Sequence, residues 1–166
     1  MNKYMILFAV GKNRLGIVDE VSSYLYERNA NIIDSRMAVM GGHFTITCLF
    51  FCSSEEVESI QSNLKDLNDF GLATSLHEAD NPDSMQTEAS LPLKLEVISM
   101  DHPGIVQNIV HILKKYNVCI QSLDTELKAM PHTGAPMFDL NLEASVPANQ
   151  SIAKVKDELN DMASEM

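Results

Sequence analysis

The sequence predicts an α+β protein built from two similar units in tandem. Three observations predict this class. The chain has 166 residues, of which 45% are hydrophobic, which is enough for two small cores. Apolar residues change between strand spacing and helix spacing several times along the chain. The whole pattern returns without a gap when residues 5–32 are aligned with residues 93–120.

The first unit reads as strand, helix, strand, strand, helix, strand. An apolar run opens it, Gly41-Gly42 marks a hairpin turn, and Ser53 with Glu56 has the spacing of a helix capping box. We expect strands over 4–10, 32–39, 44–50 and 72–76, one helix over 15–28 and one helix after Ser53. The predicted buried helix positions are Ile17, Val18, Val21, Tyr24 and Leu25, then Val57, Ile60, Leu64 and Leu67.

The second unit repeats this order but has no residues for a last strand before Met166. We expect strands over 93–99, 118–127 and 137–144 and helices over 104–116 and 149–163. The predicted buried helix positions are Ile105, Val106, Ile109, Leu113 and Tyr116, then Ile152, Val155, Leu159 and Met162. Either another chain or the linker covers the open sheet edge, or the unit stays three-stranded.

Both units therefore have the split β-α-β order of ferredoxin-like folds, an antiparallel sheet with two helices on one face. The predicted fold is two ferredoxin-like βαββαβ units in tandem, the second lacking its last strand. The polar segment between the repeats contains Pro82 and has no periodicity. We expect a first domain over 1–79, a linker over 80–90 and a second domain over 91–166.

Charge and cysteine content narrow the functional classes. The chain carries 23 acidic and 12 basic residues, a net charge of −11, which disfavours direct binding to nucleic acid or to an anionic membrane. The apolar run over 5–10 is too short for a secretory signal or a membrane span. Three cysteines without framework spacing indicate a reduced, cytoplasmic protein. Cys48 and Cys52 share a strand face, which favours core packing over metal binding. We expect no metal, no cofactor and no catalytic residues.

One turn occurs twice, between the first strand and first helix of each unit: Asn13-Arg14-Leu15-Gly16 and Asp101-His102-Pro103-Gly104. Such a turn presents backbone N–H groups at a helix N-terminus, where the helix dipole favours an anion. Asn13 or Asp101 can hold an ammonium group through side-chain oxygen. Together these features suit the two charges of an α-amino acid. Ordinary helix capping explains the same residues, so that alternative stays open.

With Asn31-Ile32 opening the second strand, these turns resemble the ACT-domain family of regulatory modules. The resemblance covers both repeats. It implies a ligand site between paired units, at the turn of one and the second strand of its neighbour. Carried over by position, the contacts are Asn13, Arg14, Leu15, Gly16, Asn31 and Ile32 in the first unit and Asp101, His102, Pro103, Gly104, Cys119 and Ile120 in the second. Two residues depart from the family pattern: Leu15 replaces the proline, and Cys119 aligns with Asn31.

The resemblance also implies a function. Residues 31–41, leading into Phe44-Thr45, look most like tandem ACT regulators of transcription. These bind a small amino acid such as glycine and a LysR-type activator protein, which they release when glycine is plentiful, without touching DNA themselves. The expected protein is therefore a non-enzymatic, cytoplasmic regulator that assembles into a homo-oligomer. Two alternatives remain: an assembly or adaptor module without ligand sensing, and a fragment related to formyltetrahydrofolate deformylases, whose catalytic domains ACT units also precede.

Overall fold

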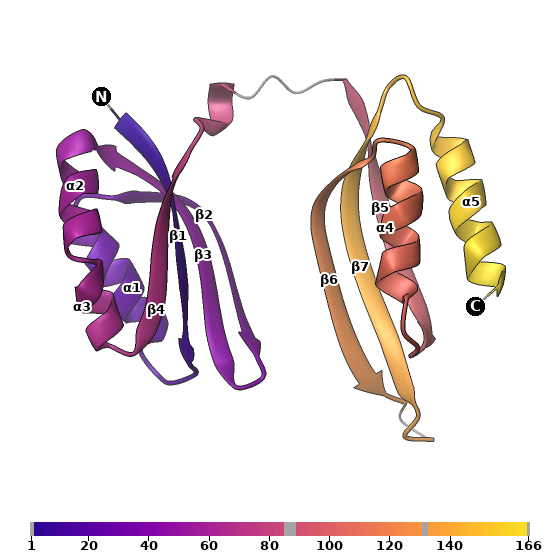
Figure 1. Cartoon of the computed structure of the whole chain (residues 1–166), viewed down its shortest axis with the longest axis horizontal. Helices are drawn as coiled ribbons and strands as arrows, with labels where there is room; N and C mark the ends of the chain where they lie inside the picture. Colours follow the sequence, from indigo (N-terminus) through magenta and orange to yellow (C-terminus); the bar gives the residue numbers. More distant parts are fainter. Residues whose placement is uncertain (1, 85–88, 131–132, 166) are drawn as a thin grey trace. The chain divides into compact units, whose positions relative to one another are not determined.

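The computed structural model describes residues 2–84, 89–130 and 133–165. It divides into two compact units, Met1–Met85 and Gln86–Met166, which are described separately below and are drawn together in Figure 1. Residues 85–88 of the expected linker lie outside the described residues. The remainder of that segment includes a short 3-10 helix, η1 (Pro82–Ser84), where the backbone N–H of Asp83 donates to the Asn81 side chain at 3.0 Å.

Unit one has the predicted order of elements. A four-stranded sheet in the order β2-β3-β1-β4 has antiparallel neighbours throughout. Its helices all lie on one face of the sheet (Figure 1). The elements are β1 (Asn2–Lys12), α1 (Ile17–Tyr26), β2 (Asn31–Met40), β3 (His43–Ser53), α2 (Ser54–Ser62), α3 (Leu64–Asp69) and β4 (Leu72–Ala79). The predicted ferredoxin-like fold is confirmed for this unit.

The second helix of unit one differs from the prediction because it is broken in two at Asn63. The capping box that starts it is present: the Ser53 hydroxyl accepts from the Glu56 N–H, and the Glu56 carboxylate accepts from the Ser53 N–H. At Asn63 the backbone leaves the helix (φ −111, ψ 16), and its side-chain amide donates to the Ser59 carbonyl at 2.8 Å. Since Asn competes for helix backbone groups in this way, it ends α2 and lets α3 start in a new direction.

The core of unit one lies between the helices and one face of the sheet. Leu7, Phe50 and Ile60 are 0% exposed, and Cys48 and Cys52 are buried beside them, so their predicted role in core packing is confirmed. Val18 was expected on this face but is 44% exposed. The buried side chains of α1 are Ile17, Val21, Tyr24 and Leu25. The burial prediction for Val18 is wrong because α1 buries a narrower stripe of side chains than the run of apolar residues suggests.

Unit two has three strands in the order β5-β7-β6, again antiparallel, with two helices on one face. Its elements are β5 (Ser90–Met100), α4 (Ile105–Lys115), β6 (Cys119–Ala129), β7 (Pro136–Pro147) and α5 (Ile152–Glu165). The predicted absence of a last strand holds within the described residues. Val106 is the second wrong burial prediction: it is 36% exposed, whereas Ile112, one turn and a half further on, is buried at 7%.

The two units repeat backbone details as well as elements. Gly16 and Gly104 take left-handed conformations at φ 93 and φ 103, and Asn29 and Asn117 do so at φ 51 and φ 54. Both second strands also contain a bulge, between Ile32 and Asp34 in β2 and between Ile120 and Ser122 in β6. The two members of each pair occupy aligned positions of the sequence repeat. The repeat therefore preserves irregular backbone positions as well as the hydrophobic pattern.

Helix lengths and hydropathy also bear on membrane association. Among the described residues, no helix combines the length and apolar character needed to cross a bilayer.

Candidate functional site

The first repeated turn, Asn13 to Gly16, joins the end of β1 to the start of α1. The backbone N–H of Asn13 donates to the Gly42 carbonyl at 2.9 Å, which ties the turn to the β2–β3 hairpin. Leu15 is fully exposed. Gly16 is the N-cap of α1 and contributes no side-chain hydrogen bond, so no side chain of the cap itself covers the first N–H groups of the helix. These N–H groups are the predicted anion site.

Arg14 does not extend freely from this turn. Its guanidinium forms a two-pronged ion pair with the Glu20 carboxylate and also donates to the Phe70 carbonyl at 2.8 Å. Hydrogen bonding from Arg14 lowers the pKa of the Glu20 carboxyl below its ordinary value, so the carboxylate stays ionised at neutral pH. A side chain built on Gly16 would meet Glu20 Oε1 at 3.8 Å. Unit one therefore places a carboxylate of its own near the N-terminus of α1.

The second turn, Asp101 to Gly104, has the same backbone design with different side chains. The N–H of Asp101 donates to the Pro136 carbonyl at 3.3 Å, matching the bond from Asn13 to Gly42 in unit one. His102 lies against the turn, with Nδ1 3.2 Å from the Pro103 carbonyl. Gly104 caps α4 without a side-chain bond.

The turns also differ in the residue that faces the capping glycine. A side chain built on Gly104 would meet Asn108 Nδ2 at 3.9 Å, at the position that corresponds to Glu20. An amide can donate hydrogen bonds to an anion, whereas a carboxylate repels one. At this one position unit two therefore has an amide donor, where unit one has a carboxylate paired with Arg14. Sequence reasoning missed both Glu20 and Asn108, although their shared position in the repeat was a usable signal.

The structure does not bring the turn and second strand of one unit together. In unit one, Asn31 pairs with Phe51, which pairs with Tyr4 near the start of β1. The turn follows Lys12, at the opposite end of the same strand. The same holds in unit two, where Cys119 pairs with Ser145 and Ser145 with Pro92 near the start of β5. The two halves of the expected ligand site therefore belong to opposite ends of each sheet.

The second-strand candidates are all at least partly accessible. Asn31, Ile32 and Cys119 are exposed and Ile120 is half-buried. Asn31 and Ile33 line a small hollow with Asn81 and Asp83 beside η1. No described residue of the turn belongs to the lining of that hollow.

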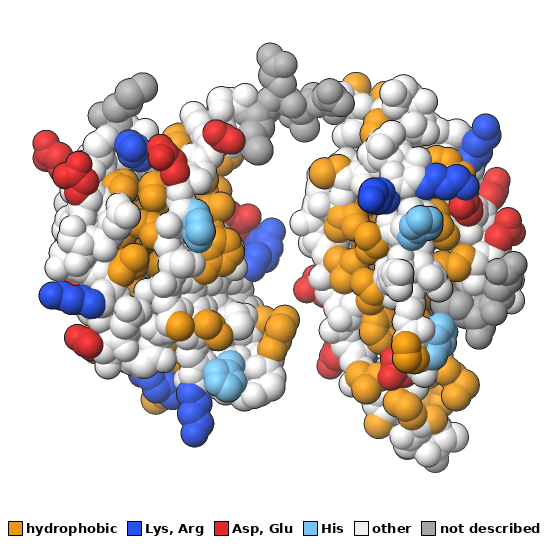
Figure 2. Space-filling model, in the orientation of Figure 1, with side chains coloured by type: hydrophobic (Ala, Val, Ile, Leu, Met, Phe, Trp, Pro, Cys, Tyr) orange, Lys and Arg blue, Asp and Glu red, His pale blue; other side chains and the backbone are white. Residues whose placement is uncertain are grey.

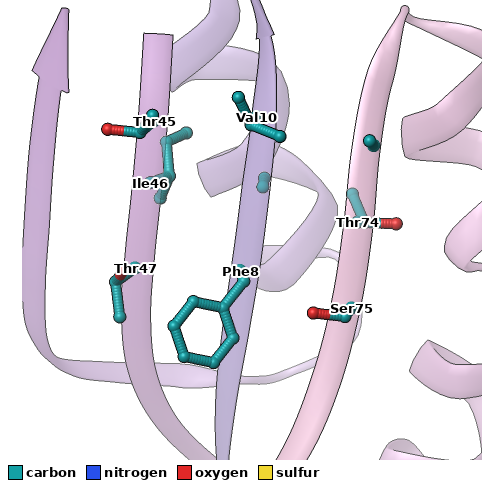
Figure 3. A pocket seen from close by; sticks show the side chains of 9 residues that line it. Phe8, Val10, Thr45, Ile46, Thr47, Thr74 and Ser75 are labelled. Atoms are coloured by element: carbon teal, nitrogen blue, oxygen red, sulfur yellow. The ribbon is translucent and has the colours of Figure 1, made fainter. Parts of the chain in front are cut away.

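A second candidate surface lies on the face of the unit-one sheet that carries no helices. Here Phe8 and Val10 are both 41% exposed. With Thr45, Thr47 and Ser75 they line a shallow hollow across three strands (Figure 3). Hydrophobic side chains reach the surface widely in both units (Figure 2). This hollow offers hydroxyl groups but no charged partner for an ammonium or carboxylate, so it suits apolar contact better than an amino acid. The unbroken apolar run over 5–10 was the sequence signal for it.

Comparison with known proteins identifies the family. The family model described as ACT domain matches residues 3–77, which is unit one from its first strand to its last. The chain belongs to the ACT-domain family. A UPF0237 protein of Clostridium perfringens is 35% identical over 73 residues, covering 43% of the chain and 79% of that protein.

Two further comparisons extend over both units of this ACT protein. The glycine cleavage system transcriptional repressor of Escherichia coli (strain K12) is 21% identical over 164 residues, covering 98% of the chain and 85% of the repressor. A crystal structure of an unknown protein from Galdieria sulphuraria superposes with a TM-score of 0.84 at 27% identity, covering 99% of this chain and 94% of the other. The chain is therefore a tandem ACT protein similar to a regulator, as the sequence predicted.

Residues 2–84, 89–130 and 133–165 contain no group of three or more His, Cys, Asp or Glu side chains that could hold a metal ion.

The three cysteines of the ACT protein are expected to differ sharply in reactivity. Burial, with a smaller contribution from the Asp34 carboxylate, raises the pKa of the Cys48 thiol to about 11, and burial likewise raises the pKa of Cys52. Cys119 is exposed at the start of β6. Since the thiolate is the reactive form, we expect Ellman's reagent at pH 8 to titrate Cys119 rapidly in the native protein and all cysteines only in denaturant. Cys119→Ser should abolish the rapid phase and Cys52→Ser should leave it; rapid reaction of the Cys119→Ser variant would contradict this.

Proposed function

We propose that this ACT protein is a non-enzymatic, cytoplasmic regulator that binds glycine or a similarly small amino acid and controls transcription through an activator protein of the LysR type. The single observation that carries the proposal is the similarity to a glycine cleavage system transcriptional repressor over 98% of the chain. The net charge of −11 supports a protein partner rather than DNA. Similarity confined to one unit would support an ACT domain but not this function.

The proposed ligand site uses the repeated turns. The α-carboxylate accepts hydrogen bonds from the first N–H groups of α1 or α4, where each capping glycine contributes no side chain. Asn13 and Asp101 are the proposed partners of the ammonium group. Because Asn31, Ile32, Cys119 and Ile120 lie at the other end of their own sheets, their proposed contribution comes from a neighbouring unit.

Unit two is the stronger site in this proposal. Asn108 adds an amide donor beside Gly104, whereas Glu20 adds a negative charge beside Gly16. A ligand carboxylate would have to approach the N-terminus of α1 against that charge, even though Arg14 partly neutralises it. We therefore expect the two turns to bind the same amino acid with unequal affinity.

Calorimetric titration with glycine, alanine, serine and leucine tests ligand binding. We expect glycine to bind and leucine not to bind. Asn108→Asp should weaken glycine binding at least tenfold, because it places a carboxylate where the ligand carboxylate sits. The matched control is Asn160→Asp, the same change on the exposed surface of α5, which should leave binding unchanged. No heat with any amino acid, or equal effects of the two variants, would overturn the ligand proposal.

Partner binding is tested separately. The purified chain, immobilised, should capture a LysR-type activator of the same organism, and excess glycine should release it. Release is expected because a ligand that binds the partner-free state more tightly shifts the population of the protein toward that state. Capture that no amino acid alters would instead support the adaptor alternative. Hydrolysis of 10-formyltetrahydrofolate by the purified chain would support the deformylase alternative.

A further inference from the structure

The face of the unit-one sheet that carries no helices is largely apolar. Side chains of β1 and β3 point alternately to the core and to this face, and residues directly opposite each other in the two strands share a face. Six large apolar or aromatic side chains gather here, each exposed or partly exposed: Tyr4, Ile6, Phe8, Val10, Leu49 and Phe51. A continuous apolar patch on a protein surface marks an interaction site.

The corresponding face of unit two is charged. Lys94 and Glu96 in β5 occupy the positions of Ile6 and Phe8 in β1, and Lys94 pairs with Glu143 on the neighbouring strand at 2.6 Å. The fold therefore does not require an apolar face at these positions. The face of unit two is also a poor cover for that of unit one, because its charges would lose water without gaining partners.

The apolar face combines a projecting side chain with a hollow. Phe8 is 41% exposed, and its ring meets the ring of His77 edge-on with 5.5 Å between their centroids. Beside it, the short side chains of Thr45 and Thr47 line the shallow hollow of Figure 3. A surface with these two features side by side suits a second copy of itself, because the projection of each copy can fill the hollow of the other.

We propose that this face packs against the same face of a second copy of the chain, with a two-fold axis along the strands between β1 and β3. The axis sets β1 of each copy over β3 of the other, so that Phe8 enters the hollow at Thr45 and Thr47 of the second copy. Ile6 and Leu49, which are directly opposite in the β1–β3 ladder, then lie over each other's counterparts. Two sheets stacked in this way keep their strands within about 30° of each other and about 10 Å apart.

Area and charge both suit this dimer. With strands about 4.8 Å apart and a rise of about 3.4 Å per residue, four strands of seven residues form a face of about 19 by 24 Å. Two such faces together bury on the order of 1,000 Å², the size at which specific interfaces begin. Arg36 and Asp34 pair with each other at 2.6 Å on β2, which is a marginal strand. Their charges therefore stay at the rim of the contact, where water reaches them.

Sedimentation equilibrium of the full chain tests the contact. Phe8→Glu and Leu49→Glu place glutamate where unit two carries Glu96 and Glu143, so the ferredoxin-like sheet accommodates both changes. Each should weaken association about tenfold or more and halve the assembled mass at micromolar concentration, because it buries a carboxylate against apolar side chains of the second copy. Tyr26→Glu, at an 81% exposed position of α1, is the matched control and should leave the mass unchanged.

Cysteine cross-linking assigns the contact to this face. Thr47 lies in the middle of β3 beside the proposed axis, so Thr47→Cys in a Cys119→Ser background should join to its own counterpart through a bismaleimide with a two-carbon spacer. Ser59→Cys, on the exposed surface of α2, is the control and should stay unjoined. Circular dichroism checks that the glutamate variants are folded. If either unfolds, the cross-link still decides, because Thr47→Cys adds no charge and changes little volume.

Three results would overturn the proposal: a natural chain that is monomeric at all concentrations, an assembled mass that neither glutamate variant changes, or equal cross-linking of the two cysteine variants. A monomer that loses capture of an activator protein through Phe8→Glu would assign the face to that partner and not to a second copy. The contact involves neither turn 13–16 nor turn 101–104, so its test is independent of ligand binding.

Discussion

Replacing Phe50 by alanine is expected to lower the free energy of unfolding of unit one by about 3–5 kcal/mol. Phe50 is 0% exposed and is the largest of the fully buried side chains of the chain's described part. It lies on the helix-facing side of β3, in register with Met5 on β1 and Ile32 on β2. Truncation removes most of its contacts and leaves a cavity, and the surrounding sheet is held by ladders on both sides and cannot collapse into it.

Native-state hydrogen exchange measures this effect unit by unit. In Phe50→Ala the amides of β1 and β3 should lose protection, whereas those of β5 and β7 should keep theirs, because the two cores share no residue. Phe70→Ala is the matched control: Phe70 is 50% exposed, and its loss should cost about 1 kcal/mol or less. Equal losses of protection in the two variants would contradict the assigned core.

Replacing Gly11 by serine is the second large effect, expected to cost about 1–3 kcal/mol. A side chain at Gly11 would start 2.7 Å from the Gly71 carbonyl oxygen and 2.7 Å from Leu72 Cδ2. The first of these is backbone, at the point where β4 begins beside β1, so the two strands would have to separate. The expected loss of stability is steric in origin, because Gly11 does not have one of the left-handed conformations that only glycine adopts easily.

The repeat supplies the control for this variant. Ser99 occupies the equivalent position in β5, where no strand lies alongside among the described residues. Ser99→Ala should therefore change the free energy of unfolding by about 0.5 kcal/mol or less. Urea unfolding of both variants decides the matter. A Gly11→Ser protein as stable as the natural one would mean that β4 does not lie against β1 as described.

Hydrophobic spacing and turn residues were sufficient to predict the order of elements and the capping box at Ser53. These features depend on local sequence, which is why they could be predicted. The break at Asn63 could not be predicted in the same way, because Leu64 and Leu67 continue the apolar spacing across it. Val18 and Val106 show the same limit: periodicity identifies a face but not its width, which depends on how far the sheet extends beneath the helix.

The candidate site was only partly predictable. The turn residues Asn13 to Gly16 and Asp101 to Gly104 lie together because they are consecutive in sequence. Their relation to Asn31 and Cys119 depends on strand direction, which places each second-strand start at the far end of its own sheet. The charge near each capping glycine depends on Glu20 or Asn108, which lies four residues further along the helix. A motif that ends at the glycine does not include this residue.

That exchange of Glu20 for Asn108 also has a consequence for signalling range. Two identical binding sites in one molecule would be occupied over the same narrow range of effector concentration. A molecule whose two sites bind the effector with unequal affinity fills them one after the other, so its dose–response curve is broad and graded. Under the proposed function, such a protein would report gradual changes in the cellular supply of its effector instead of a single threshold.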